Sequence, residues 1–251
     1  MSRAQVWSSG GGVQSAAVAA LIVRGDIEPP ALSAIVDVGR EARTTWAYMD
    51  SVITPALAGV GVVLHRVLKS DFATVDLYRG EELLIPAFTD QNGSIGKLPT
   101  YCSNEWKRRV LQRWARSRLP DETGFDVWIG ISTDEMKRTR QDIGKWENRY
   151  PLIEKRLNRG DCLALVERMG WPAPPRSSCW MCPNRGAAEW DFLRENDPEE
   201  FELACEFERE IRKKDEGLWL TREGVNLSEL KESKKTGDLF LGRCDSGFCF
   251  T

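Results

Sequence analysis

The 251-residue sequence has a single histidine, His65. This excludes metal sites built from several histidines, and a histidine-dependent triad would have to use His65. That residue stands in the apolar run VGVVLHRVL, which favours a core or strand-end position over a catalytic one. No run of 18 apolar residues occurs, so we expect no transmembrane helix and no membrane partner. A basic segment leading into an apolar stretch is also missing at the start, which predicts a cytoplasmic protein.

The charge is nearly balanced, with a formal net charge of −3, and this alone does not predict nucleic-acid binding. The distribution is uneven, because residues 107–118 carry six cationic side chains and no acidic one. Such a face could meet phosphates, and a solvated helix face is the alternative. The six are Lys107, Arg108, Arg109, Arg113, Arg116 and Arg118.

The seven cysteines are an odd number, and disulfides are disfavoured in the cytosol, so clustered cysteines suggest metal binding or redox chemistry. Cys179 and Cys182 form a C-x-x-C motif in a proline-rich loop, which is compatible with zinc, an iron–sulfur cluster or a redox pair. Cys162 and Cys205 lie in apolar helix-like patterns, and we expect them to be buried thiols.

Strands alternate with helices in the first part of the chain, which predicts an α/β fold with a doubly wound, mostly parallel sheet. After about residue 150 the pattern becomes helical and cysteine-containing. We therefore expect a nucleotide-binding α/β domain at 1–150 and a helical C-terminal region at 151–251, with a C-x-x-C loop and a cysteine-rich tail. The helix predicted over 42–61 contains Pro55, which should disturb it.

A glycine loop, SSGGGVQS at residues 8–15, follows the first predicted strand and opens a predicted helix. Glycines let the backbone approach an anion closely, and a helix start adds unpaired N–H groups and the positive end of a dipole. No Gly-Lys-Ser/Thr follows, so the loop is not a Walker motif, and the G-x-G-x-x-G spacing is absent. The stretch is a candidate phosphate site, with a tight structural turn as the alternative.

Four segments in consistent order, over about residues 4–185, resemble the PP-loop adenine nucleotide α-hydrolase superfamily, and especially its PAPS reductase-like branch. SSGGGVQS resembles the PP-loop S-G-G-x-D-S and, more closely, the reductase form that ends in Gly-Ile-Gln-Ala. VDVGREARTTWAYMD resembles the strand-end motif D-T-G-x-x-x-P-E-T. YCSNEWKRRVLQRW resembles the reductases' segment that leads to a lysine and a helix, and GISTDEMKRTR resembles their loop G-I-R-x-D-E-x-x-x-R.

This resemblance implies that the protein binds an adenine nucleotide, either ATP or APS/PAPS. Mg²⁺ would bridge a leaving pyrophosphate with help from Asp134 or Glu135, although Gln14 stands where ATP-cleaving relatives usually carry aspartate. The implied nucleotide-binding residues are Ser9, Gly10, Gly11, Gly12, Gln14, Ser15, Asp37, Gly39 and Arg140. The implied catalytic residues are Lys107, Glu135, Arg138 and Cys249.

The resemblance also implies a [4Fe–4S] cluster at Cys102, Cys179 and Cys182, with zinc as the alternative metal. APS reductases use a Cys-Cys pair where this chain has Tyr101-Cys102, so one ligand is missing. Cys244 or Cys249 could supply it, or a three-cysteine cluster would keep an open iron.

The function we expect is activation of an acceptor by adenylation, with pyrophosphate release, followed by sulfur transfer. Nucleic acid (tRNA or DNA) and a sulfur donor protein are the expected partners. One alternative is a sulfonucleotide reductase that releases sulfite from APS or PAPS, although the tail CDSGFCFT lacks the reductases' E-C-G-x-H. The other is a non-catalytic nucleic-acid-binding module with structural zinc.

Overall fold

The computed structural model describes residues 3–91 and 94–232, which form two compact units. The sequence suggested one boundary near residue 150, whereas each unit takes two separate segments of the chain. Within the described residues, unit 1 comprises 3–74 and 105–177, and unit 2 comprises 75–91, 94–104 and 178–232.

Unit 1 is built on a five-stranded sheet with the order β3-β2-β1-β8-β9, and every neighbouring pair is parallel. Trp7, at the centre of the sheet, pairs with Ser33 on one side and Trp128 on the other. The predicted parallel sheet is therefore confirmed. Its strands are β1 (Ala4–Ser9), β2 (Leu32–Asp37), β3 (Leu64–Leu68), β8 (Phe125–Ile129) and β9 (Trp146–Arg149).

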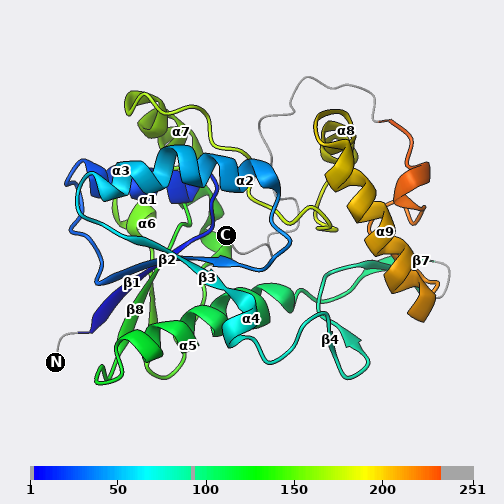
Figure 1. The fold of residues 1–251 in the computed structure, drawn as a ribbon, viewed down its shortest axis with the longest axis horizontal. Helices are drawn as coiled ribbons and strands as arrows, with labels where there is room; N and C mark the ends of the chain where they lie inside the picture. The colour runs from blue at the N-terminus through cyan, green and yellow to red at the C-terminus, as the bar shows by residue number, and fades with distance from the viewer. Residues whose placement is uncertain (1–2, 92–93, 233–251) are drawn as a thin grey trace. The chain divides into compact units, whose positions relative to one another are not determined.

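Helices cover both faces of this sheet, as a doubly wound fold requires (Figure 1). The longer helices α1 and α7 pack against each other on one face, and α5 covers the opposite face near β2 and β3. The helices of unit 1 are α1 (Val13–Val23), α2 (Arg43–Tyr48), α3 (Thr54–Ala58), α4 (Lys69–Phe72), α5 (Arg109–Arg118), α6 (Pro151–Glu154) and α7 (Arg159–Arg168).

The α1 helix is buried from Val13 to Ile22, because small alanine side chains let it approach both the sheet and α7 closely. It ends at Val23, and Gly25, two positions later, has φ +74°, a conformation that favours glycine after a helix end. The α7 helix begins at a capping box, in which Asn158 and Asp161 each accept a hydrogen bond from the other's backbone N–H. This helix buries the Cys162 thiol, as the sequence predicted, and burial raises the pKa of that thiol to about 12.

The helix predicted over 42–61 is present and is disturbed before Pro55, as expected. A π-helical turn, Met49–Ile53, separates α2 from α3. Proline has no N–H to donate to the preceding turn, so the hydrogen-bond ladder widens there. A second π-helical turn, Ser103–Arg108, leads into α5.

Unit 2 contains short strands that the sequence patterns did not predict. A three-stranded antiparallel sheet has the order β10-β6-β7, and β4 pairs with β5. The predicted helices α8 and α9 are both present, and α9 buries Cys205 as expected. The elements of unit 2 are β4 (Tyr78–Arg79), β5 (Glu82–Leu83), β6 (Phe88–Gln91), β7 (Ser94–Lys97), α8 (Ala187–Asn196), α9 (Pro198–Lys214), β10 (Leu218–Trp219) and the 3₁₀ turn Leu227–Glu229.

Glu208 ties α9 to the segment that follows it. Its buried carboxylate accepts hydrogen bonds from the backbone N–H groups of Leu220 at 2.7 Å and Leu227 at 2.6 Å. Burial raises the pKa of Glu208, and these hydrogen bonds act in the opposite direction.

Among the described residues, no helix combines the length and apolar character that crossing a membrane requires.

The topology places a switch point at the end of β1. From β1 the chain crosses to β2 and then β3 on one side, and it later returns to β8 on the other side. Loops that leave β1 and β8 in opposite directions separate at such a switch point, where open α/β sheets bind their ligands. The glycine loop follows β1 directly and so occupies this position.

Core packing around α7 gives a direct test of the fold of unit 1. Leu165→Ala removes a side chain that is 3% exposed and should lower the free energy of unfolding by about 2–5 kcal/mol. Leu203→Ala, at a helical position that is 41% exposed, is the matched control and should change it by less than about 1 kcal/mol. Urea denaturation measures both. Equal losses in the two variants would contradict the packing described.

Candidate functional site

The loop after β1 has a backbone conformation that only glycine accommodates well. Gly11 has φ +76°, and a Cβ atom built on it would lie 2.7 Å from Cγ2 of Thr45 and 3.3 Å from Cδ1 of Ile35. Both the left-handed conformation and the close approach of β2 and α2 side chains exclude larger residues. These two constraints explain why the middle residue of the GGG sequence, Gly11, is a glycine.

The start of α1 presents backbone donors to this loop. Gly12 is the N-cap and, having no side chain, makes no side-chain cap. The N–H groups of the first helical turn have no intrahelical acceptor, and they carry the positive end of the helix dipole. Ser15 holds the loop from within, because its Oγ accepts a hydrogen bond of 2.7 Å from the N–H of Gly10. These features make the loop a candidate anion cradle.

Three buried hydroxyls lie at the ends of the elements around this cradle. The Oγ atoms of Ser9 and Ser132 and Oγ1 of Thr45 have no hydrogen-bond partner among the residues that the structure describes. Ser9 ends β1, Ser132 follows β8, and Thr45 contacts the Gly11 position. Burying a hydroxyl without a partner costs about 1–3 kcal/mol. A polar ligand bound at the loop would supply partners for these three hydroxyls.

Gln14 lies at the centre of a charged network beside the cradle. Its Nε2 donates to Oε2 of Glu135 at 2.9 Å, and its Oε1 accepts from Nη1 of Arg159 at 3.3 Å. Glu135 Oε1 accepts from Nη1 of Arg138 at 2.7 Å. The buried amide thus joins an acidic and a basic side chain, and its orientation is fixed by both. The predicted residues Gln14, Glu135 and Arg138 are brought together in this way.

Asp37 and Gly39 are adjacent at the end of β2, as predicted. Asp37 Oδ1 accepts from the N–H of Gly39 at 2.7 Å, and its Oδ2 accepts from Nη2 of Arg66 at 2.6 Å. The guanidinium of Arg66 in turn lies 3.6 Å from the centroid of the Trp46 ring. Asp37 therefore shapes the strand-end turn through interactions within the protein.

Lys107 reaches the same strand end from the π-helical turn before α5. Its Nζ lies 3.4 Å from Oε1 of Glu41, whose other oxygen accepts from the N–H of Val38 at 3.0 Å. This ion pair places the ammonium group of Lys107 beside the turn formed by Asp37 and Gly39.

Arg140 belongs to a cluster of cationic side chains. Burial, and then the positive charges of Arg108 and Arg138, lower the pKa of Arg140 to about 10, against an opposing effect of Tyr150. Tyr150 also fixes the backbone here, since its hydroxyl accepts a hydrogen bond of 2.7 Å from the N–H of Arg140. Burial also lowers the pKa of Arg108. Cationic groups that repel one another are stabilised by an added anion.

The predicted metal ligands Cys102, Cys179 and Cys182 all belong to unit 2. Cys179 and Cys182 begin and end a tight turn, in which the N–H of Cys182 donates to the carbonyl of Cys179 at 3.1 Å. Within 3–91 and 94–232, histidine, cysteine and acidic side chains do not gather in groups of three that could hold a metal ion. Cys244 and Cys249 lie outside the described residues, and the four-cysteine set stays a prediction.

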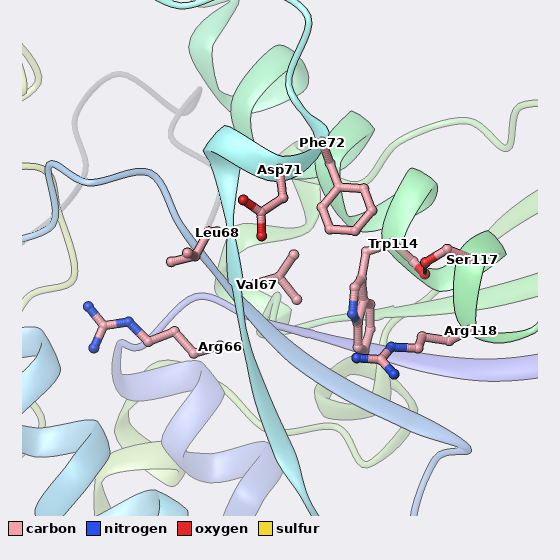
Figure 2. A pocket seen from close by; sticks show the side chains of 8 residues that line it. All are labelled: Arg66, Val67, Leu68, Asp71, Phe72, Trp114, Ser117 and Arg118. Atoms are coloured by element: carbon pink, nitrogen blue, oxygen red, sulfur yellow. Dashed lines mark hydrogen bonds between the residues drawn. The ribbon is translucent and has the colours of Figure 1, made fainter.

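A separate pocket of about 300 Å³ lies in unit 1 between β3, α4 and α5 (Figure 2). Trp114 and Phe72 line it, while Arg66 points away from Trp114 toward the other side of β3. His65 packs against Trp114 with ring centroids 5.2 Å apart, which agrees with the predicted strand position. Burial lowers the pKa of His65, as does the charge of Arg118. The pocket contains none of the predicted site residues.

Sequence reasoning missed Arg159, Ser132 and Ser177. The Oγ–H of Ser177 donates to the carbonyl of Gly10 across 167 positions of sequence. Only the fold brings such distant segments together. Ser132 lies in the quoted segment GISTDEMKRTR, but its burial without a partner is visible only in the structure.

Comparison with known proteins found similarity at the level of structure alone. No protein-family model matches the chain, and no curated protein matches it. The U34-tRNA thiolase NcsA from Methanococcus maripaludis, solved with its [4Fe–4S] cluster, is similar with a TM-score of 0.41 and 14% identity, over 83% of this chain and 71% of that one. The PAPS reductase from Candida auris, in a phosphate complex, is similar with a TM-score of 0.43 and 12% identity, over 72% of this chain and 83% of that one. Similarity of this degree carries no conclusion about substrate or activity.

The network around Gln14 can be tested by exchanging its amide and carboxylate. At pH 7, Gln14→Glu sets two carboxylates against each other and should lower the free energy of unfolding by about 1–3 kcal/mol, measured by urea denaturation. Adding Glu135→Gln restores one amide facing one carboxylate, with Arg159 now beside the charge, and should recover most of the loss. A double variant less stable than Gln14→Glu would contradict the network.

Proposed function

We propose that the protein binds an adenine nucleotide through the glycine loop and activates an acceptor by adenylation for sulfur transfer. The observation that carries this proposal is the cradle at the switch point, with its positive φ at Gly11, its uncapped helix start and the buried hydroxyls of Ser9, Thr45 and Ser132. Phosphate oxygens are acceptors only, so they complement a site made of N–H and O–H donors.

In the proposed reaction an oxygen of the acceptor forms a bond to the α-phosphorus of ATP. The bond from that phosphorus to the bridging oxygen breaks, and pyrophosphate leaves with the electron pair, while the acceptor's proton passes to solvent. A sulfur nucleophile from a donor protein then attacks the activated carbon and displaces AMP. The catalytic contribution of the protein is mainly positioning and stabilisation of charge at phosphorus.

The cationic residues beside the cradle would supply that stabilisation. Arg138 and Arg159 converge on the network of Gln14, one through Glu135 and one directly. The guanidinium of Arg138 is 11% exposed, so a phosphate that it contacts is partly shielded from water, which strengthens the attraction. Glu135 acts as a positioning residue in this arrangement, because it orients both Arg138 and the amide of Gln14.

Magnesium would enter with the nucleotide, since it binds through phosphates and one or two carboxylates and so needs no cage of protein ligands. Asp134 would fit this role, because its carboxylate is exposed and is anchored by the N–H of Arg159, which donates to Oδ1 at 3.0 Å. The metal would neutralise the charge that develops on the leaving pyrophosphate.

A sulfonucleotide reductase is the second candidate. The neutral amide at Gln14, in place of a carboxylate, favours it. The amide occupies the position where ATP-cleaving relatives usually carry an aspartate, and its oxygen is already an acceptor for Arg159. A nucleotide that is cleaved without release of pyrophosphate needs no carboxylate there. Sulfite released from APS or PAPS, with no pyrophosphate from ATP, would select this candidate.

A nucleic-acid acceptor is supported by the outer face of α5. Arg109, Arg113 and Arg116 lie on one stripe of the helix, opposite the buried Val110 and Trp114. Each also has a partner within the protein: Glu105, the carbonyl of Phe72 and the Trp146 ring, respectively. A guanidinium has five donors, so one internal contact leaves donors for phosphates.

Nucleotide binding by the loop can be tested with alanine substitutions. Gly11→Ala should weaken ATP binding by about tenfold or more, because the added methyl group collides with Thr45 and deforms the cradle. Gly25→Ala is the matched control: it has nearly the same φ, +74°, with no atom within 4 Å of the added group, and it should leave binding unchanged. Isothermal titration calorimetry measures both, and a pyrophosphate assay follows turnover.

Gly12→Ala provides a variant without backbone strain, since Gly12 has φ −105°. Its methyl group would lie 3.4 Å from Cβ of Ser177, which is an ordinary contact, so the variant should fold. The variant should nevertheless bind ATP less tightly than the wild type, because the methyl group occupies part of the loop. Wild-type affinity in both loop variants would overturn the assignment of the loop as the phosphate site.

A further inference from the structure

Ser177 closes the glycine loop from a distant part of the chain. Its hydroxyl donates to the carbonyl of Gly10, and it is buried. A Cβ atom built on Gly12 would lie 3.4 Å from Cβ of Ser177 and 3.8 Å from its backbone nitrogen, and one built on Gly11 would lie 3.5 Å from its Oγ. Ser177 therefore bonds to Gly10 and occupies the space that a side chain on Gly11 or Gly12 would need.

The segment that delivers Ser177 is stiff. Pro172, Pro174 and Pro175 precede it, and proline fixes φ near −65° and restricts the residue before it. These prolines restrict the approach of the chain to Ser177, and on the other side only Ser178 separates Ser177 from Cys179.

Ser177 is also the last residue of its segment of unit 1, and Cys179 follows two positions later in unit 2. The turn from Cys179 to Cys182 continues without interruption, because the N–H of Arg185 donates to the carbonyl of Cys182 at 3.1 Å and its Nη2 donates to the carbonyl of Cys179 at 3.3 Å. One short stretch of backbone thus links a contact on the glycine loop to the C-x-x-C motif.

We propose that Ser177 is a positioning residue that couples occupancy of the glycine loop to the order of the Cys179–Cys182 turn. A phosphate bound by the N–H groups of the loop holds Gly10 in place, and the bond from Gly10 to Ser177 then restrains the chain that enters the turn. The cysteines are ordered when nucleotide is bound, and they are released to move when it leaves. This inference rests on the proposed function, since it requires a phosphate-bearing ligand in the loop.

Hydrogen–deuterium exchange of the full chain, with and without ATP, tests the coupling. In the wild-type protein, ATP should slow amide exchange by about threefold or more both in the loop at 10–16 and in the turn at 179–185. In Ser177→Ala, ATP should still protect the loop, and the protection of the turn should be lost. Ser178→Ala, which removes a neighbouring hydroxyl that has no bond to the loop, is the matched control and should behave as the wild type.

The outcomes separate the two proposals. No protection of the loop by ATP in the wild type would overturn the proposed function itself. Protection of the loop without protection of the turn in the wild type would overturn the coupling alone. Protection of the turn that persists in Ser177→Ala would show that Ser177 is not the link, and would equally overturn the inference. Unchanged exchange in the β1 core confirms that each variant is folded.

Discussion

The whole site depends on one backbone conformation, the positive φ of Gly11 immediately after the central strand. With no Cβ atom at this position, side chains from β2 and α2 can approach within contact distance, and Ser177 can reach the loop from above. The chain then turns directly into α1, whose first N–H groups have no intrahelical acceptor. A side chain at Gly11 would collide with Thr45, so this turn requires glycine.

Each carboxylate near the glycine loop already accepts a hydrogen bond from a group of the protein. The carboxylates of Asp37, Glu41 and Glu135 each accept hydrogen bonds from a backbone N–H, an amide or a guanidinium, so none of them lies unpaired against an incoming phosphate. Arg138, Arg159 and the helix start supply positive charge. The neutral amide of Gln14 adds no charge to this balance, and it joins two segments 121 residues apart. An anionic ligand fits this balance better than a bare cation does.

The elements with strong periodicity were predicted correctly, and the long-range contacts were not. The apolar run of β2, the alanine-rich α1 and the amphipathic α5 follow from local patterns, and Pro55 and Gly25 acted as their chemistry requires. The short strands of unit 2 escaped prediction, because pairs of two to four residues carry little pattern. The sequence predicted two parts with a boundary near residue 150. It carries no signal that each unit combines two separate segments, since this depends on a segment that leaves unit 1 at residue 75 and returns at 105. Ser177 and Arg159 have no local signal at all; only tertiary structure brings them to the loop.

A nucleotide phosphate is proposed to occupy the loop between Gly10 and Val13. A crystal structure of the protein with a non-hydrolysable ATP analogue tests it most directly. We predict phosphate oxygens within hydrogen-bond distance of the N–H groups at residues 11–13, with the hydroxyl of Ser9 or Thr45 turned toward the ligand. Clear density for the analogue at another place, such as the pocket between β3 and α5, with the loop and its buried hydroxyls unchanged, would contradict the account.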